Sequence, residues 1–197
     1  MESKLEKIRE QVTDCKKCDL WKTRTNAVPG KGNFHSDVVF IGEAPGRSED
    51  NKGEPFIGAA GKKLSLALET AGIKREEVYI TNVVKCRPPN NRIPNVEERK
   101  ICRDYLEKEI SIIKPKIICI LGNTAFNSLL GGSEITKFRG KTIQREGQIY
   151  FLTIHPAATI YNQELISVLK KDMINLFELI KAIKNNETIR IDIESHS

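Results

Sequence analysis

Short runs of apolar, largely β-branched residues recur along the chain and predict buried strands. Four such runs occupy residues 37–42, 78–84, 116–121 and 149–154. They are nearly continuous rather than alternating, which is typical of strands covered on both faces of a parallel sheet. We therefore expect a central sheet of four strands.

Helical periodicity fills the intervals between these runs, and each helical segment ends at a recognised stop signal. The segments are 62–71 before Gly72, 96–113 before Pro115, and 124–130 before Gly131 and Gly132. Asn95 followed by Glu98 resembles a capping box. Strands that alternate with helices predict an α/β fold with three layers, in which helices flank a mostly parallel sheet.

Both ends of the chain have helical patterns of their own. Leu5, Ile8 and Val12 mark one face of a short N-terminal helix, and a long closing helix is predicted from apolar residues at helical spacing: Leu165, Leu169, Met173, Leu176, Ile180 and Ile183. The length suits one globular domain. We assign residues 1–184 to that domain and residues 185–197 to a polar, flexible tail.

Polar, Gly and Pro residues follow the predicted strands directly. They are the segment 42–46, Asn82, the pair 122–123 and the pair 155–156. In an open parallel sheet, sites form at the carboxyl ends of the strands. The pattern therefore predicts one cleft along one edge of the sheet.

Composition narrows the class of protein further. With 39% hydrophobic and 29% charged residues the chain resembles a folded protein rather than a disordered one. The N-terminus lacks the apolar core of a signal peptide, and no apolar run is long enough to span a bilayer, so we expect a cytoplasmic protein without membrane contact. A net charge of +6 suits a polyanionic partner, but 26 acidic residues make that signal weak.

Five cysteines in a cytoplasmic chain are unlike a disulfide framework. Cys15 and Cys18 form a CxxC turn, Cys86 follows the second strand and Cys102 lies in the helix 96–113, whereas Cys119 lies within an apolar strand. The first four are candidate metal ligands. By spacing alone, structural zinc and an iron-sulfur cluster are both open.

A glycine-rich loop, 42–50, follows the first strand and leads to Phe56 between Pro55 and Gly58. One interpretation is a phosphate-binding loop of a nucleotide-binding enzyme. The loop matches neither the GxGxxG nor the GxxxxGK[ST] pattern, and its Glu43 would repel phosphate. A lone histidine such as His155 is more often structural, so the motifs must be taken together.

Taken together, the GEAPG loop, the EPFIG aromatic, the TNVVKCRPPNNR segment and the HPAA segment resemble the family 4 uracil-DNA glycosylases, the thermostable iron-sulfur type. The resemblance spans Cys15 to about Asn162. It implies a uracil-DNA glycosylase-like fold and a DNA-repair hydrolase, which flips uracil out of DNA and hydrolyses the N-glycosidic bond to leave an abasic site for base excision repair.

The resemblance also implies a 4Fe-4S cluster, with structural zinc as the alternative. The cluster ligands of the family match Cys15, Cys18, Cys86 and Cys102. Glycosidic hydrolysis requires no electron transfer, so we expect the cluster to be structural.

The uracil pocket of the family matches six positions here: Gly42, Glu43, Ala44, Phe56, Asn82 and His155. Phe56 offers a flat face for stacking, and the Asn82 amide can pair with uracil O4 and N3. His155 can donate a hydrogen bond to O2 as negative charge develops on the departing base. We therefore name His155, Glu43 and Asn82 as catalytic.

Two roles remain open from the sequence. The position that carries a water-activating aspartate in the best-known branch of the superfamily is Ala44 here, so Glu43 or Asn91 is left to orient the water. Ile160 or Tyr161, after the HPAA segment, is a candidate wedge for the gap left by a flipped base, or else anchors the closing helix.

The main alternative function is a non-catalytic metal-cluster module that binds uracil or lesions in DNA. Some relatives trap the base through a histidine in the loop matching residues 87–95, which contains none here. Expected partners are single- or double-stranded DNA containing uracil, free uracil as product and a sliding clamp, and we expect a monomer. High Ile, Lys and Glu content suits a hot habitat, although genome base composition produces the same bias.

Overall fold

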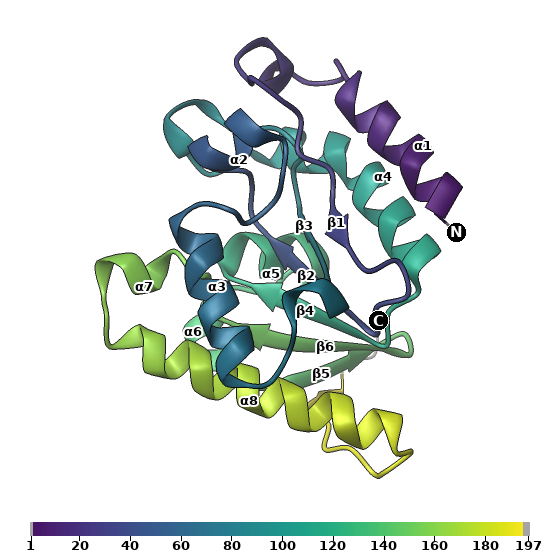
Figure 1. The fold of residues 1–197 in the computed structure, drawn as a ribbon, viewed down its shortest axis with the longest axis vertical. Helices are drawn as coiled ribbons and strands as arrows, with labels where there is room; N and C mark the ends of the chain where they lie inside the picture. Colours follow the sequence, from purple (N-terminus) through teal and green to yellow (C-terminus); the bar gives the residue numbers. More distant parts are fainter. Residues whose placement is uncertain (1, 195–197) are drawn as a thin grey trace.

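The computed structural model describes residues 2–194, which form one sheet between two layers of helices (Figure 1). The sheet has seven strands in the order β1-β3-β2-β4-β6-β5-β7. Their bounds are β1 Lys31–Gly32, β2 Val38–Gly42, β3 Tyr79–Asn82, β4 Ile117–Leu121, β5 Thr142–Arg145, β6 Gln148–Thr153 and β7 Ile193–Glu194.

The four strands predicted from the sequence are the parallel centre of this sheet. β2 pairs in parallel with β3 and β4, and β4 pairs in parallel with β6. The predicted count of four is incomplete, because β1 and β5 add antiparallel pairs at the two sides and β7 pairs with β5. These edge strands have two to four residues and contain no apolar run, so the hydrophobic pattern did not mark them.

The main helices also follow the predicted pattern. The helices are α1 Glu2–Thr13, α2 Arg47–Lys52, α3 Ala59–Thr70, α4 Val96–Ile113, α5 Asn123–Leu130, α6 Ile135–Phe138, α7 Ala158–Tyr161 and α8 Leu165–Lys184, with short 3-10 turns at Asp19–Lys22, Arg75–Glu77 and Pro89–Asn91. The predicted capping box is confirmed: the Asn95 side chain accepts from the Glu98 amide and the Glu98 carboxylate accepts from the Asn95 amide. α4 therefore begins at the predicted residue.

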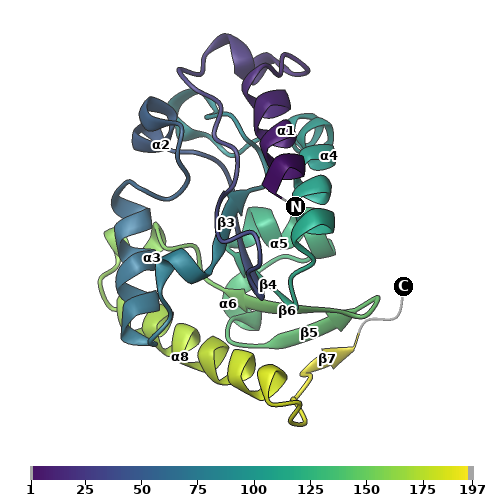
Figure 2. The ribbon, with the colours of Figure 1, turned by 45° about the vertical axis from the view of Figure 1, so that its right-hand side comes forward.

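Alternate residues of the central strands face opposite helical layers. Val39 and Ile41 of β2 belong to a core shared with α1, α4 and α5, whereas Val38 and Phe40 belong to a core shared with α3 and α8. Figure 2 shows the sheet between these two groups of helices. Burial on both faces explains why the central strands are apolar at every position.

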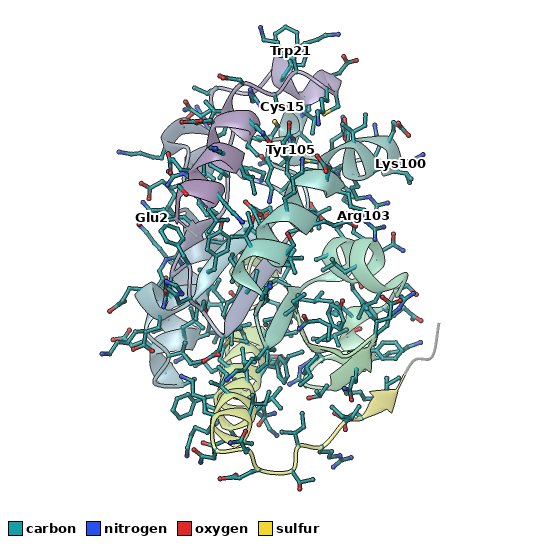
Figure 3. The ribbon with its side chains drawn as sticks, turned by 90° about the vertical axis from the view of Figure 1, so that its right-hand side faces the viewer. Glu2, Cys15, Trp21, Lys100, Arg103 and Tyr105 are labelled. Atoms are coloured by element: carbon teal, nitrogen blue, oxygen red, sulfur yellow. The ribbon has the colours of Figure 1, made fainter. Side chains whose placement is uncertain are left out.

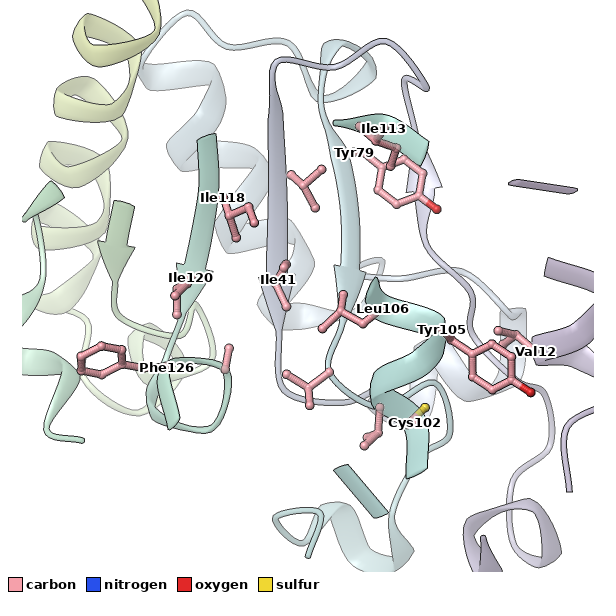
Figure 4. Close-up of a cluster of buried hydrophobic side chains, with 14 of the residues drawn as sticks. Val12, Ile41, Tyr79, Cys102, Tyr105, Leu106, Ile113, Ile118, Ile120 and Phe126 are labelled. Carbon is pink, nitrogen blue, oxygen red and sulfur yellow. The ribbon is translucent and has the colours of Figure 1, made fainter. Parts of the chain in front are cut away.

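The first of these cores is seen in Figure 4, where Ile41, Ile118 and Ile120 of the sheet lie opposite Leu106 of α4 and Phe126 of α5. This core packs one face of the sheet against α4 and α5.

Part of the predicted tail returns to the sheet, since Ile193 is the register partner of Ile143 and the Asp192 amide donates to the Thr142 carbonyl over 2.9 Å. Residues 195–197 of that tail lie outside the described residues, and flexibility of the segment 185–197 stays a prediction. Over residues 2–194, no helix is both long and apolar enough to cross a membrane.

Candidate active site

A cleft of about 520 Å³ opens at the carboxyl ends of the central strands. The loops after β2, β3 and β6 contribute Glu43, Asn82 and His155 to its walls, and α7 closes one side. The predicted edge is therefore where the cleft lies. Its lining also includes Ala44, Phe56, Asn91, Ile160 and Tyr161.

Phe56 is held against the end of β2 by two glycines. A Cβ on Gly42 would lie 2.5 Å from the Phe56 ring and 2.6 Å from Asn82 Oδ1, and a Cβ on Gly61 would lie 1.8 Å from the Phe56 carbonyl oxygen. Neither position accepts a side chain without displacing its neighbours. Phe56 has φ of 53°, a left-handed conformation that costs a non-glycine residue energy and so needs support from its surroundings.

Two charged side chains supply that support. Glu49 of α2 is buried, and its Oε1 accepts from the amides of Ile57 over 3.0 Å and Gly58 over 2.7 Å. Arg75 donates through Nη2 to the carbonyl oxygens of Pro55 over 3.0 Å and Phe56 over 2.8 Å. The Phe56 peptide is thus fixed on both sides.

Asn82 is the last residue of β3 and is 1% exposed. Its side-chain Oδ1 is buried and has no hydrogen-bond partner within the described chain. An unpaired buried acceptor is unfavourable in a folded protein unless a ligand or water satisfies it. This atom lies in the cleft wall beside the Phe56 ring.

His155 presents the complementary group. Its Nδ1 accepts from the Ala157 amide over 3.2 Å, so the proton of a neutral ring is assigned to Nε2, which is buried and unpaired among residues 2–194. Burial lowers the His155 pKa to about 4, against a smaller opposing effect of Glu49. The imidazole is therefore a neutral donor at neutral pH, and its ring lies 5.8 Å from that of Phe56.

Glu43 and Ala44 begin the loop after β2 and are both half-buried. Glu43 Oε2 accepts a hydrogen bond from the Thr124 hydroxyl at the start of α5. Asn91 lies at the exposed rim, where its Oδ1 accepts from Arg87 Nε over 2.7 Å. Both candidates for water orientation thus line the cleft, and each already holds one protein partner.

The mouth of the cleft carries apolar and basic groups. Tyr161 is 91% exposed and Ile160 is 41% exposed, both on α7. Arg47 and Arg92 line the same opening. An apolar tip beside guanidinium groups suits a surface that contacts nucleic acid.

The four candidate metal ligands lie together near the N-terminal end of α4. Cys86 and Cys102 belong to the buried core, and Cys15 and Cys18 pack against that core. Figure 3 shows Cys15 close to Tyr105 of α4, and Figure 4 shows Cys102 one turn away. Cys119, in contrast, is fully buried in β4 in the core on the other face of the sheet.

The cysteine thiols are close to one another and accept hydrogen bonds, as the sulfur ligands of metal sites do. Burial raises the Cys86 pKa, and Cys18 and Cys15 add to that rise against an opposing effect of Arg24. Cys86 Sγ accepts from Arg24 Nη1 over 2.9 Å, and Cys102 Sγ accepts from the Lys85 amide over 3.3 Å. Hydrogen bonds of this kind support metal-bound sulfur. Within residues 2–194, no three His, Cys, Asp or Glu side chains are already arranged to hold a single metal ion.

The structure brings all the predicted pocket residues to one cleft, with Gly42 directly behind its wall. Sequence reasoning missed Glu49, Arg75 and Thr124, which hold that cleft in shape. An acidic residue in the short polar helix α2 carries no sign in the sequence that it faces inward. The TNVVK segment also contains Lys85, and nothing in the sequence indicates that this lysine is buried.

Comparisons with known proteins agree with this geometry. The family model described as the uracil DNA glycosylase superfamily matches residues 29–178. The type-4 uracil-DNA glycosylase of Sulfurisphaera tokodaii is 48% identical over 89% of this chain and 84% of its own length. The enzymes of the same name from Archaeoglobus fulgidus and Thermotoga maritima are 47% and 43% identical, each over 91% of this chain and 94% and 96% of their own lengths.

Proposed function

This chain belongs to the uracil DNA glycosylase superfamily, and we propose from its cleft how it excises uracil from DNA. It is a uracil-DNA glycosylase, a hydrolase of N-glycosyl bonds that acts in DNA repair. The reaction adds water across the bond between uracil N1 and deoxyribose, releases free uracil and leaves an abasic site for base excision repair.

One observation carries the proposed mechanism: an acceptor, Asn82 Oδ1, and a donor, His155 Nε2, are both buried and unpaired in the described chain and line the same cleft. Uracil offers their complements, because its N3–H donates to Asn82 Oδ1 and its O2 accepts from His155. The Asn82 amide nitrogen donates to O4. Cytosine presents the opposite pattern at N3 and at its exocyclic amine, so both groups of the Asn82 amide are left unpaired.

His155 acts on the leaving group. As the glycosidic bond breaks, negative charge develops on the base, and a fixed donor at O2 stabilises that charge. The donor must be neutral and preorganised, as the lowered pKa and the Ala157 contact support. Phe56 holds the base plane so that O2 meets His155.

Water then attacks the sugar carbon from which the base departs. An oxocarbenium-like deoxyribose is strongly electrophilic and needs little activation of the water. We assign orientation of the water to Glu43, whose carboxylate is held by Thr124, with Asn91 as the second candidate. Ala44 leaves room at the position where an aspartate serves this purpose elsewhere in the superfamily.

DNA must deliver the base from outside the duplex stack. Flipping costs a few kcal/mol in lost pairing and stacking. We propose that Ile160 or the highly exposed Tyr161 fills the gap left by the base, and that Arg47 at the mouth contacts a phosphate. The substrate is uracil-containing DNA in single- or double-stranded form.

We propose that Cys15, Cys18, Cys86 and Cys102 hold a 4Fe-4S cluster. The donor chemistry fits, since four thiolates are the usual ligands, and each iron takes its own thiolate, so the sulfurs need not converge on one point. The cluster joins the N-terminal segment to the loop after β3 and to α4. Structural zinc is the alternative that metal analysis distinguishes.

The remaining expectations concern the surroundings of the enzyme. We propose that it acts as a monomer in the cytoplasm and that a sliding clamp recruits it to DNA. Size-exclusion chromatography with and without the clamp tests both the oligomeric state and the partner.

The decisive experiment incubates the protein with a uracil-containing oligonucleotide, followed by alkaline cleavage of abasic sites. A matched oligonucleotide with thymine at the same position is the control. We expect strand cleavage and free uracil from the first substrate only. Tight binding to uracil DNA without release of uracil would identify the non-catalytic module instead.

A further inference from the structure

A buried ion pair lies directly behind the pocket. Lys85 Nζ is 2.6 Å from Glu109 Oε2, and both side chains are 1% exposed. Lys85 follows β3 by three residues, and Glu109 lies in the middle of α4. Burying two charges is unfavourable unless their geometry and hydrogen bonds compensate. The hydrogen bonds of both side chains show which groups the pair holds in place.

All hydrogen-bonding capacity of the Lys85 ammonium is used. Its three protons go to Glu109 Oε2, to the Thr81 hydroxyl over 2.5 Å and to the backbone carbonyl of Asn82 over 2.9 Å. An ammonium has three donors and no acceptor, so no proton remains for another partner. The last of these bonds fixes the peptide of the residue whose side chain lines the cleft.

Glu109 in turn holds the ammonium in place. Its Oε2 also accepts from the Thr81 hydroxyl over 2.8 Å, and its Oε1 accepts from the Gly30 amide over 2.9 Å and lies 3.4 Å from the Tyr79 hydroxyl. Tyr79 is seen in Figure 4 near the start of β3. A carboxylate with four donors has one preferred position, and through Lys85 it gives the Asn82 carbonyl one preferred position too.

We propose that Lys85, held by Glu109, is a positioning residue that sets the direction of the Asn82 amide toward uracil. The inference rests on the proposed function. Asn82 is the last residue of β3, and Lys85 Nζ donates to its carbonyl oxygen. The N–H of the same peptide, that of Val83, donates to the Gly42 carbonyl over 2.9 Å, so β2 holds this peptide on one side and Lys85 holds it on the other.

Loss of Lys85 should affect recognition of the base rather than binding of the DNA backbone. Without the ammonium, the Asn82–Val83 peptide keeps its bond to Gly42 but loses the bond on its oxygen and can tilt, and a reacting geometry displaced by about 1 Å can lose roughly 10²-fold in rate. The DNA contacts proposed above come from other elements, namely the α7 wedge and Arg47. Affinity for DNA that contains no base at the site should therefore be unaffected.

The test variant replaces both members of the pair, Lys85→Met with Glu109→Met. The single Lys85→Met change leaves a buried carboxylate without its cation and destabilises the fold, whereas replacing both charges by apolar side chains of similar length is often tolerated. The matched control is Lys181→Met with Glu178→Met, an exposed lysine-glutamate pair on α8. Visible absorption and thermal melting confirm that each variant is folded and carries its cluster.

Three quantities are measured on the full chain: the single-turnover rate on a uracil oligonucleotide, the inhibition constant of free uracil and the affinity for a duplex with an abasic site. We expect the Lys85/Glu109 variant to excise uracil roughly 10- to 100-fold more slowly. Free uracil should inhibit it at least several-fold more weakly, while affinity for abasic DNA stays within about twofold, as for the control.

An excision rate within about twofold of the wild type overturns the proposal, as does a parallel loss of affinity for abasic DNA, because that would reflect general structural damage. A folded state too unstable to assay after both charges are removed also overturns it, since the pair would then serve the fold. Failure of the wild type to release uracil is a different result and refutes the proposed function itself.

Discussion

Replacing His155 with alanine removes the donor that we assign to uracil O2, and the structure sets the size of the effect. Nε2 is buried and has no other partner in the described chain, so no neighbouring side chain is placed to take over its role. Donors aimed at developing negative charge contribute about 2.7 to 4 kcal/mol in comparable sites, or roughly 10²- to 10³-fold in rate. We expect a loss of that order in single-turnover excision.

The same change also has a structural side that must be separated from the chemistry. His155 Nδ1 accepts from the Ala157 amide, and the ring lies beside that of Phe56. Losing one such hydrogen bond costs about 1 kcal/mol of stability, too little to unfold the protein. His35→Ala is the matched control, because His35 is exposed and is not among the residues that line the cleft.

The assay uses excess enzyme over a uracil oligonucleotide, with abasic sites cleaved by alkali at each time point. Affinity for abasic DNA is measured in parallel. We expect His155→Ala to lose rate while keeping that affinity, and His35→Ala to match the wild type. A His155→Ala rate within about threefold of the wild type would make the histidine structural and refute the mechanism, because loss of a transition-state donor must appear in the rate.

Four further outcomes are expected. Asn82→Asp should slow uracil excision and relax discrimination against cytosine, because a carboxylate no longer donates to O4; unchanged discrimination in matched oligonucleotides contradicts this. Cys102→Ser should remove the visible absorption of the cluster and Cys119→Ser should retain it, whereas stoichiometric zinc in a colourless active protein refutes the cluster. Binding to undamaged duplex should weaken steeply from about 50 to about 200 mM salt, and a flat profile counts against phosphate contacts. Burial lowers the His155 pKa from 6.5 to about 4, so protonating the ring in the folded protein is unfavourable by up to about 3 kcal/mol. Stability is therefore unaffected above pH 6.5 and falls as pH drops toward 4, and equal acid sensitivity of His155→Asn contradicts this.

The residues that line the cleft could be predicted because a single physical rule places them. Asn82 and His155 each follow an apolar run, and the carboxyl ends of parallel strands meet at one edge. The helices were predictable where an apolar face or a cap marks them, as in α4 with its Asn95–Glu98 box. Family resemblance then supplied the chemistry.

The supporting residues could not be predicted because their partners lie far away along the chain. Glu109 bonds to Gly30, 79 residues away, and the sequence around Glu109 resembles any solvated helix face. Glu49 lies in α2, a six-residue polar helix without an apolar face, yet its carboxylate faces inward to the amides of the Phe56 loop. Long-range polar pairing leaves no periodic trace, so hydrophobic pattern alone does not reveal it.

The unpaired atoms of the pocket connect stability with specificity. Asn82 Oδ1 and His155 Nε2 have no partner among the described residues, and a buried polar group that an entering base leaves unpaired costs roughly 1 to 3 kcal/mol. Uracil satisfies both atoms through its N3–H and O2, whereas cytosine shares O2 but has no N3–H and leaves Asn82 Oδ1 unpaired. The Lys85–Glu109 pair holds the backbone carbonyl of Asn82, and Glu49 holds the loop that carries Phe56. Discrimination between the two bases therefore depends on the rigidity of residues that never touch them.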